Sequence, residues 1–346
     1  MQLDLDTFLT IVYCIVDDLY RERFAPLKPQ RPGRRPAMCD SEVLCLAVLA
    51  QWQHNRSERA FLAYAVRHLR QYFPRWPTQS AFNRRVRDLS GVLCSLGPAL
   101  AQRSMAELGL HSAYEVLDAV PVPLLRRCRA NKQRQFANEA AIGVGGADKD
   151  WFFGMKLLIS ITPEGQITGF IEGPANTDER WLAEALLRWR QDAEAPAPRL
   201  EDLAEALGPT HQAGGERKGP TGPLAPYLGV GQAADGPYLG DLGYKGAIWY
   251  AHWHEDYHAE VLTKADYAGE PDPELQREGR HWLSSHRQVV ETAFDWLTHT
   301  FGVSYPRART YWGVLTRLGA KIAAFNLLVH INHLLGRPKF AQFCPI

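Results

Sequence analysis

The sequence predicts an α/β protein in which an all-helical N-terminal region precedes a mixed β-sheet flanked by helices. Two observations support this fold class. Up to about residue 110, apolar residues recur at helical spacing, as Phe8, Ile11, Val12 and Ile15 do in the first segment. From Tyr114 onward, short segments rich in β-branched and aromatic residues alternate with amphipathic helical segments.

The composition is that of a globular protein with more than one domain. The chain has 346 residues, of which 46% are hydrophobic and 22% are charged. Its six cysteines show no C-x-x-C spacing, which is typical of reduced thiols in a cytoplasmic protein. No signal peptide is evident, and the apolar segment near the C-terminus is interrupted by Lys321 and Asn326, which predicts a packed amphipathic helix and no membrane partner.

Shifts in composition suggest where the domains begin and end. We expect a helical domain over residues 1–110, a sheet-containing domain over 111–336 and a short tail over 337–346. Residues 193–236 hold 6 prolines and 8 glycines, which favours a flexible insertion within the second domain.

Basic residues are concentrated in the N-terminal region although the whole chain carries a net charge of only +1. Residues 1–110 contain 15 Lys and Arg against 10 Asp and Glu, which suits a DNA-binding domain. A helix that begins after Thr78 resembles the recognition helix of a helix-turn-helix. Solvent-exposed basic faces are the alternative. The candidate DNA contacts are Arg34 and Arg35 in a proline-rich linker, and Arg84, Arg85 and Arg87 on the helix.

Asp118 is the first candidate for metal-assisted chemistry. It follows the apolar strand that starts at Tyr114, and Pro121 and Pro123 predict that the strand ends or becomes an edge there. Alone, Asp118 could be a turn acceptor. The basic residues that follow it, including Arg126 and Arg129, favour a site that binds a metal beside phosphate.

Asp241 ends a second short apolar strand, and Gly243 permits a tight turn before Lys245. The third candidate carboxylate, Glu291, lies on a predicted helix that stops at Gly302 and is capped by Ser284 or Ser285.

Arg287 and Glu291 are four residues apart on that helix and point the same way. A solvent-exposed ion pair between them is the alternative to a functional role.

Two further residues belong to the segments between these acids. Residues 151–173 predict a hairpin with a turn at Pro163, in which Lys156 would reach the rim of a cleft because burying an unpaired lysine is costly. Thr177 or Asp178 is expected to cap the next helix.

The acidic residues and the short sequence motifs around them resemble those of a DDE transposase of a bacterial insertion sequence, most closely the branch named for insertion sequence 982. Asp118 lies in LDAVPV, Asp241 in GDLGYKG, and Glu291 follows Arg287 with three residues between; 122 residues separate the first two acids and 49 the last two. The resemblance runs from about residue 31 to 336 and implies a ribonuclease-H-like catalytic domain. It also places a recurring acidic residue near Asp178.

The resemblance implies metal-dependent cleavage and joining of DNA strands. Asp118, Asp241 and Glu291 would hold Mg²⁺ or Mn²⁺, two ions in all, and Arg287 would grip a phosphate. The partners would be double-stranded DNA, at the ends of the element and at the target, and a second copy of the chain. Related branches have Tyr and Lys where this sequence has Ser284 and Thr298, so the resemblance does not imply the contacts that this Tyr and this Lys make.

Other functions stay open at this point. A nuclease or resolvase of the same fold would hydrolyse DNA without joining it. A transposase-derived regulator would bind DNA without cutting it. A glycosidase with paired carboxylates lacks support, because no barrel repeat is evident.

Overall fold

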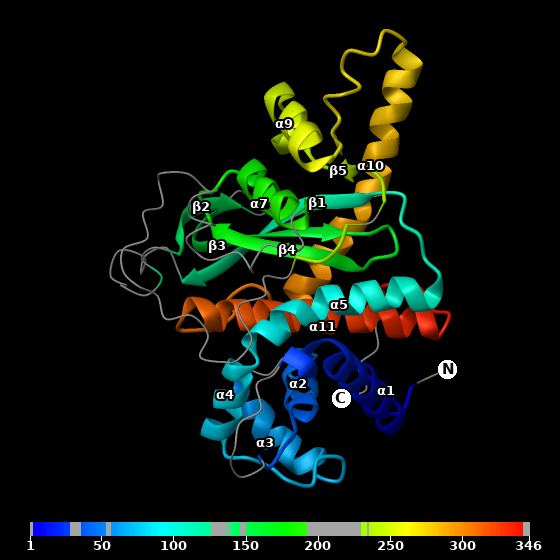
Figure 1. Cartoon of the computed structure of the whole chain (residues 1–346). Helices are drawn as coiled ribbons and strands as arrows, with labels where there is room; N and C mark the ends of the chain where they lie inside the picture. Colours follow the sequence, from blue (N-terminus) through cyan, green and yellow to red (C-terminus); the bar gives the residue numbers. More distant parts are fainter. Residues whose placement is uncertain are drawn as a thin grey trace.

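The computed structural model describes residues 3–27, 36–52, 57–125, 136, 139–145, 150–191, 230–233 and 235–341. It is an α/β structure with a helical N-terminal region and a mixed six-stranded sheet flanked by helices (Figure 1). The ribonuclease-H-like identity of the sheet stays a proposal, and so do the predicted domain boundaries.

The N-terminal region is helical where the structure describes it. The Thr78 hydroxyl accepts from Ala81 N at 3.3 Å and caps the predicted basic helix. The elements are α1 (Leu5–Leu19), η1 (Tyr20–Phe24), η2 (Ala25–Leu27), α2 (Asp40–Leu49), α3 (Glu58–His68), α4 (Gln79–Asp88) and α5 (Ser90–Leu108).

The sheet and its helices follow in the second part of the chain. The elements are β1 (Glu115–Leu125), β2 (Ala141–Gly145), β3 (Asp150–Ile161), β4 (Ile167–Pro174), α7 (Glu179–Gln191), β5 (Tyr238–Leu239), η3 (Leu242–Tyr244), α9 (Ala247–Tyr257), β6 (Val261–Leu262), α10 (Pro273–Asp295), η4 (Trp296–Thr300) and α11 (Tyr311–Leu334). β3 pairs antiparallel with β1, β2 and β4, and β1, β5 and β6 run parallel to one another.

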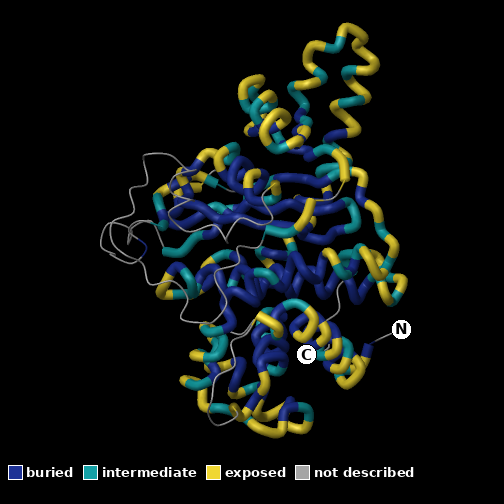
Figure 2. Tube along the Cα trace, in the orientation of Figure 1, coloured by how far each residue is buried: buried dark blue, intermediate teal, exposed yellow. Residues whose placement is uncertain are grey.

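Helices cover both faces of the sheet. α7 lies against β1, β3 and β4 on one face, while α5 and α11 pack against each other below the other face (Figure 1). The N-terminal region therefore shares its last helix with the packing of the sheet. α9 and the first half of α10 project beyond the sheet and are mostly exposed, whereas the sheet is buried (Figure 2).

β1 continues through both prolines, so the expectation that Asp118 ends a strand is wrong. Pro121 pairs with Lys156 and Pro123 with Gly154 in the ladder with β3. Alternate residues of a strand direct their N–H groups to opposite sides. Glu115 N donates to Pro237 on the β5 side, and both prolines share its parity, so neither removes a hydrogen bond to β3.

The β5 side of β1 is the edge that the prolines predicted. β5 pairs with β1 only at Glu115 and Val116, and no other described strand continues that pairing. From Leu117 onward, β1 thus has one open edge in the part of the chain that the structure describes. At the second proline, Tyr305 N donates to Pro123 O at 2.9 Å along this edge.

Several other predicted elements are confirmed. The hairpin is formed by β3 and β4, and Gly302 with φ 62° follows the end of η4. The expectation that Ser284 or Ser285 caps the helix of Glu291 is wrong. That helix, α10, begins at Pro273 and is capped by Asp272. Ser284 and Ser285 lie inside the helix and donate back to Arg280 O and Trp282 O.

α11 is the one described helix that is long and apolar enough to cross a membrane by composition. Its apolar stretch is almost entirely buried against the rest of the chain. The helix is buried around its circumference, so the expected exposed polar face is absent from it. Its polar residues bond inside instead: Asn326 donates to Gly97 O and Ile167 O, both at 2.8 Å.

Candidate functional site

The open edge of β1 places Asp118 beside the turn that follows β5. Asp118 is the fourth residue of β1, and its side chain is 21% exposed. Its Oδ1 accepts from the N–H of Ala119 at 2.8 Å. That N–H points to the side where β5 has ended, so the carboxylate satisfies a donor that a longer β5 would have bound.

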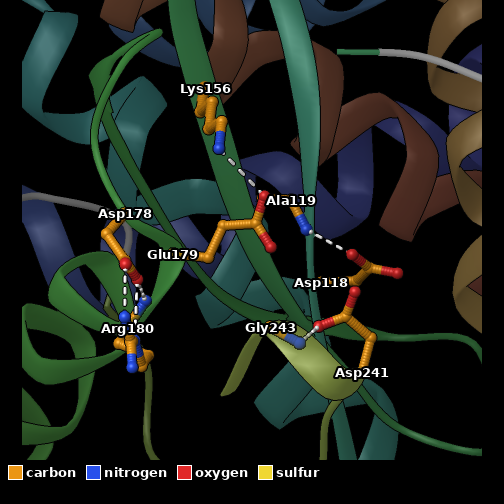
Figure 3. A network of polar contacts seen from close by, with 8 residues as sticks. All are labelled: Asp118, Ala119, Lys156, Asp178, Glu179, Arg180, Asp241 and Gly243. Atoms are coloured by element: carbon orange, nitrogen blue, oxygen red, sulfur yellow. Dashed lines mark hydrogen bonds and ion pairs between the residues drawn. The ribbon is translucent and has the colours of Figure 1, made fainter. Parts of the chain in front are cut away.

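Asp241 lies at the carboxyl end of β5, in a turn that closes on its side chain. Its Oδ1 accepts from Gly243 N at 2.7 Å and so caps η3. A Cβ on Gly243 would lie 2.8 Å from that same oxygen, which is too close. Glycine is therefore required at this position for the carboxylate to keep its orientation. Figure 3 shows the Asp118 and Asp241 carboxylates facing each other.

α10 brings a cation to this pair. Arg287 Nη2 donates to Asp118 Oδ2 at 3.0 Å, and both side chains are partly buried. Arg287 Nε is buried and has no hydrogen-bond partner in the structure. One guanidinium donor is thus occupied and another is available to an incoming acceptor.

The first turn of α7 adds a carboxylate that the sequence analysis did not identify. Glu179 Oε1 accepts from Lys156 Nζ at 3.0 Å, and in Figure 3 its carboxylate lies between Lys156 and the two aspartates. Its other oxygen, Oε2, is 3.5 Å from where a Cβ on Gly243 would be. Glu179 and Asp241 therefore flank the same glycine.

The electrostatics confirm that the three acids share one environment. Burial raises the pKa of Asp118 to about 6. Arg287 and the Ala119 N–H oppose this rise, while the negative charges of Asp241 and Glu179 add to it. Asp118 is therefore close enough to the other two acids to be repelled by each of them, and a cation bound beside it would relieve that repulsion.

Tyr244 is a buried polar group within electrostatic range of the same acids. Its side chain is fully buried, and its hydroxyl has no hydrogen-bond partner in the structure. Burial raises the pKa of the Tyr244 phenol well above its usual value, and Glu179, Asp118 and Asp241 raise it further. A buried hydroxyl without a partner costs free energy unless a ligand completes it.

The donor set fits a hard divalent cation. Carboxylate oxygens are the ligands that Mg²⁺ and Mn²⁺ prefer, and the unpartnered hydroxyl of Tyr244 adds a polar group at the site. As the side chains stand, no three Asp, Glu, His or Cys groups in the described ranges are arranged to hold a metal ion. Arg287 and Lys156 instead neutralise two of the acids.

Glu291, the third predicted acid, lies one helical turn after Arg287 and is exposed. None of the described hydrogen bonds or ion pairs joins it to Asp118 or Asp241. The alternative ion pair between Arg287 and Glu291 is not formed either, because Arg287 binds Asp118. Asp178 accepts from Arg180 N at 3.0 Å at the start of α7, as a cap does, and also binds the Arg180 side chain.

The predicted DNA contacts have different surroundings. Lys156 is tied to Glu179, Lys245 is exposed, and so are Arg84 and Arg87 on α4. Arg85 forms an ion pair with the buried Asp40 and donates to Met38 O, so its charge is already used within the N-terminal region. The remaining candidates, Arg34, Arg35, Arg126 and Arg129, lie outside the described residues.

Comparison of the chain with models of protein families, with curated proteins and with solved structures found no match in any of the three.

Proposed function

We propose that this protein is a transposase of the DDE type, which cleaves and joins DNA strands with the help of divalent cations. One observation carries the proposal. Asp118 on β1 and Asp241 after the parallel strand β5 face each other where β5 ends (Figure 3), while Arg287 binds Asp118 and Lys156 binds the neighbouring Glu179. The strand order supports a ribonuclease-H-like sheet, because β1 is central, antiparallel to β3 and parallel to β5 and β6.

Asp118 and Asp241 would hold two Mg²⁺ or Mn²⁺ ions, with Glu291 completing the set that the resemblance implies. Bound there, the ions would activate an attacking oxygen and neutralise the charge that develops on the phosphate and the leaving oxygen. Arg287 would offer its unpartnered Nε to a phosphate oxygen and keep the substrate in register. Glu291 would have to turn from the exposed side of α10 toward Asp118 to take part.

A DNA-hydrolysing nuclease or resolvase with the same site is the second candidate. It shares every feature described for the acids and differs only in lacking strand joining. A regulator that no longer cuts DNA is disfavoured by the Gly243 turn and the unpartnered Tyr244, because both shape a site that DNA binding alone does not need.

The test is cleavage of labelled DNA that spans one end of the element and its flanking host sequence. The wild-type protein is expected to cut at the boundary in Mg²⁺ or Mn²⁺ and not in EDTA. Asp118→Asn should lower the rate by about a thousandfold or more, since it removes several kcal/mol of transition-state stabilisation. The matched control is Glu278→Gln, which also replaces an acid by its amide but at an exposed position on α10.

Full activity in Asp118→Asn would exclude the proposed site. Cleavage without integration of the cut end into a target plasmid would favour the nuclease. Binding without cleavage in either metal would favour the regulator.

A further inference from the structure

Glu179 is the acid whose position calls for a role of its own. It comes from the first turn of α7, about 60 residues from either aspartate in the sequence, yet it flanks Gly243 together with Asp241, and its carboxylate lies between Lys156 and the two aspartates (Figure 3). Acidic residues are common at helix starts because they interact favourably with the helix dipole. A side chain with only that role has no reason to be directed at two other carboxylates.

Lys156 explains how Glu179 is stabilised there. Its ammonium group is 3.0 Å from Glu179 Oε1, and both side chains are about one-fifth exposed, 19% and 23%. Lys156 pairs in register with Pro121 of β1, on the strand next to Asp118. The ammonium thus supplies positive charge beside Glu179, whose carboxylate lies between Lys156 and the two aspartates (Figure 3).

The unpartnered hydroxyl of Tyr244 is an independent observation that indicates a ligand. Its fully buried hydroxyl lacks a partner and lies within electrostatic range of Glu179, Asp118 and Asp241. Gly240 allows its ring to pack close to the chain, because a Cβ on Gly240 would be 2.9 Å from the ring. The hydroxyl can donate to a ligand oxygen or to a carboxylate that turns toward it.

We propose that Glu179 is a ligand of a divalent cation held with Asp118 and Asp241, and that Lys156 is its internal counter-ion, released to the DNA backbone when the cation binds. The charges balance in this exchange. Without the cation, Lys156 neutralises Glu179; with it, the cation takes over Glu179 and leaves the ammonium free for one phosphate oxygen. The role of the cation site rests on the proposed function, while the binding of the cation to Glu179 does not.

The first experiment measures Mn²⁺ binding to the full chain without DNA, by electron paramagnetic resonance of free Mn²⁺ and by calorimetry. Glu179→Gln should weaken binding by about tenfold to a hundredfold, as expected for a ligand or a group that orients one. Lys156→Met should tighten it by about threefold to tenfold, because it removes a competing positive charge. Glu278→Gln should bind as the wild type does.

The opposite signs of the two changes separate this proposal from a structural role. If the ion pair only stabilised the fold, both variants would weaken binding or leave it unchanged. Unchanged Mn²⁺ affinity in Glu179→Gln, or weaker binding in Lys156→Met, would overturn the proposal. Circular dichroism of each variant checks that it is folded. If Glu179→Gln does not fold, the Mn²⁺ affinity of Lys156→Met still tests the proposal.

The second experiment tests the release of Lys156. Binding of a duplex without an element end is measured over a range of salt concentrations, in EDTA and in Mn²⁺. Wild type and Lys156→Met should behave alike in EDTA, whereas in Mn²⁺ the wild type should show a salt slope steeper by about one phosphate contact. Equal slopes in Mn²⁺ would overturn the release step.

The outcomes also keep this proposal distinct from the proposed function. Mn²⁺ binding that depends on Glu179, in a protein that never cuts DNA, would leave the cation site intact and exclude the transposase. Normal cleavage by Glu179→Gln with unchanged Mn²⁺ affinity would leave the transposase proposal intact and exclude Glu179 as a ligand.

Discussion

The two ends of α7 take part in polar networks of opposite character. At its last turn, Arg190 and Glu115 are almost fully buried and 2.5 Å apart. Arg190 Nη1 also donates to Tyr238 at 2.9 Å, Nη2 to Thr168 at 2.9 Å, and Nε to Gly231 O at 3.0 Å. We call this the closed network, and each of its guanidinium nitrogens has an acceptor.

At the first turn of α7, the acids Asp118, Asp241 and Glu179 form what we call the open network. Here Arg287 Nε and the Tyr244 hydroxyl are buried without partners, and the pKa of Asp118 is raised to about 6. The side chains of Arg190 and Glu115 are 5% and 2% exposed, whereas those of Arg287, Asp118 and Glu179 are 16–23% exposed. The two networks also differ in whether their donors and acceptors are satisfied, and an unsatisfied set is one that a ligand can complete.

The largest expected effect is on the closed network. Arg190→Met should lower the free energy of unfolding by about 3–5 kcal/mol, because it leaves Glu115 buried without its cation. Urea denaturation measures the change. Arg188→Met, an exposed change on the same helix, should stay within about 0.5 kcal/mol of the wild type. If Arg190→Met unfolded at the urea concentration of the wild type, the closed network would not be structural, and the comparison would lose its basis.

The sequence predicted one half of this comparison better than the other. Asp118 and Asp241 stand at short apolar strands, and strand order brings such positions to one edge of a sheet, so local pattern identified both. Arg287 was identified by its spacing from Glu291, although its partner proved to be Asp118. The closed network was not predicted, because Glu115 and Arg190 are 75 residues apart and nothing local links them.

Glu179 was missed for a related reason. It stands beside Asp178 at a helix start, where acidic residues are ordinary, and its relation to Asp241 arises only from tertiary packing. The proline argument correctly predicted that β1 becomes an edge, whereas the expectation that the strand ends at Asp118 was wrong. The parity of Pro121 and Pro123 and the early end of β5 make both prolines compatible with the strand. β2 was also missed, since its AIGVG sequence carries two glycines, which strands disfavour.

An intermediate effect is expected where the open network depends on a glycine. Gly243→Ala would place a Cβ 2.8 Å from Asp241 Oδ1, so the carboxylate would rotate and lose the hydrogen bond from residue 243. We expect Mn²⁺ affinity to fall by about tenfold to a hundredfold with little change in stability. Gly269→Ala is the control, because a Cβ there meets nothing within 4 Å. Unchanged Mn²⁺ affinity would show that Asp241 does not need this turn to hold a cation.

The smallest expected effect is the pH dependence of Mn²⁺ affinity, which tests whether Asp118 is a ligand in the open network. The pKa of Asp118 is raised to about 6, so below that pH a proton competes with a cation for the carboxylate. Mn²⁺ affinity should therefore fall by about fivefold between pH 6 and pH 5, and change little from this group between pH 7 and pH 8. Calorimetric titration of Mn²⁺ into the wild-type protein at each pH measures this.

The sign for stability is the reverse of the sign for Mn²⁺ binding. A carboxyl whose pKa is raised by folding favours the folded state while it is protonated, so the contribution of Asp118 is complete below about pH 4 and is lost as the pH rises through about 6. Protonation of Asp118 in mild acid thus weakens cation binding while it stabilises the chain. An affinity that stayed constant from pH 7 to pH 5 would mean that Asp118 is not a ligand, and the open network would then hold its cation through Asp241 and Glu179 alone.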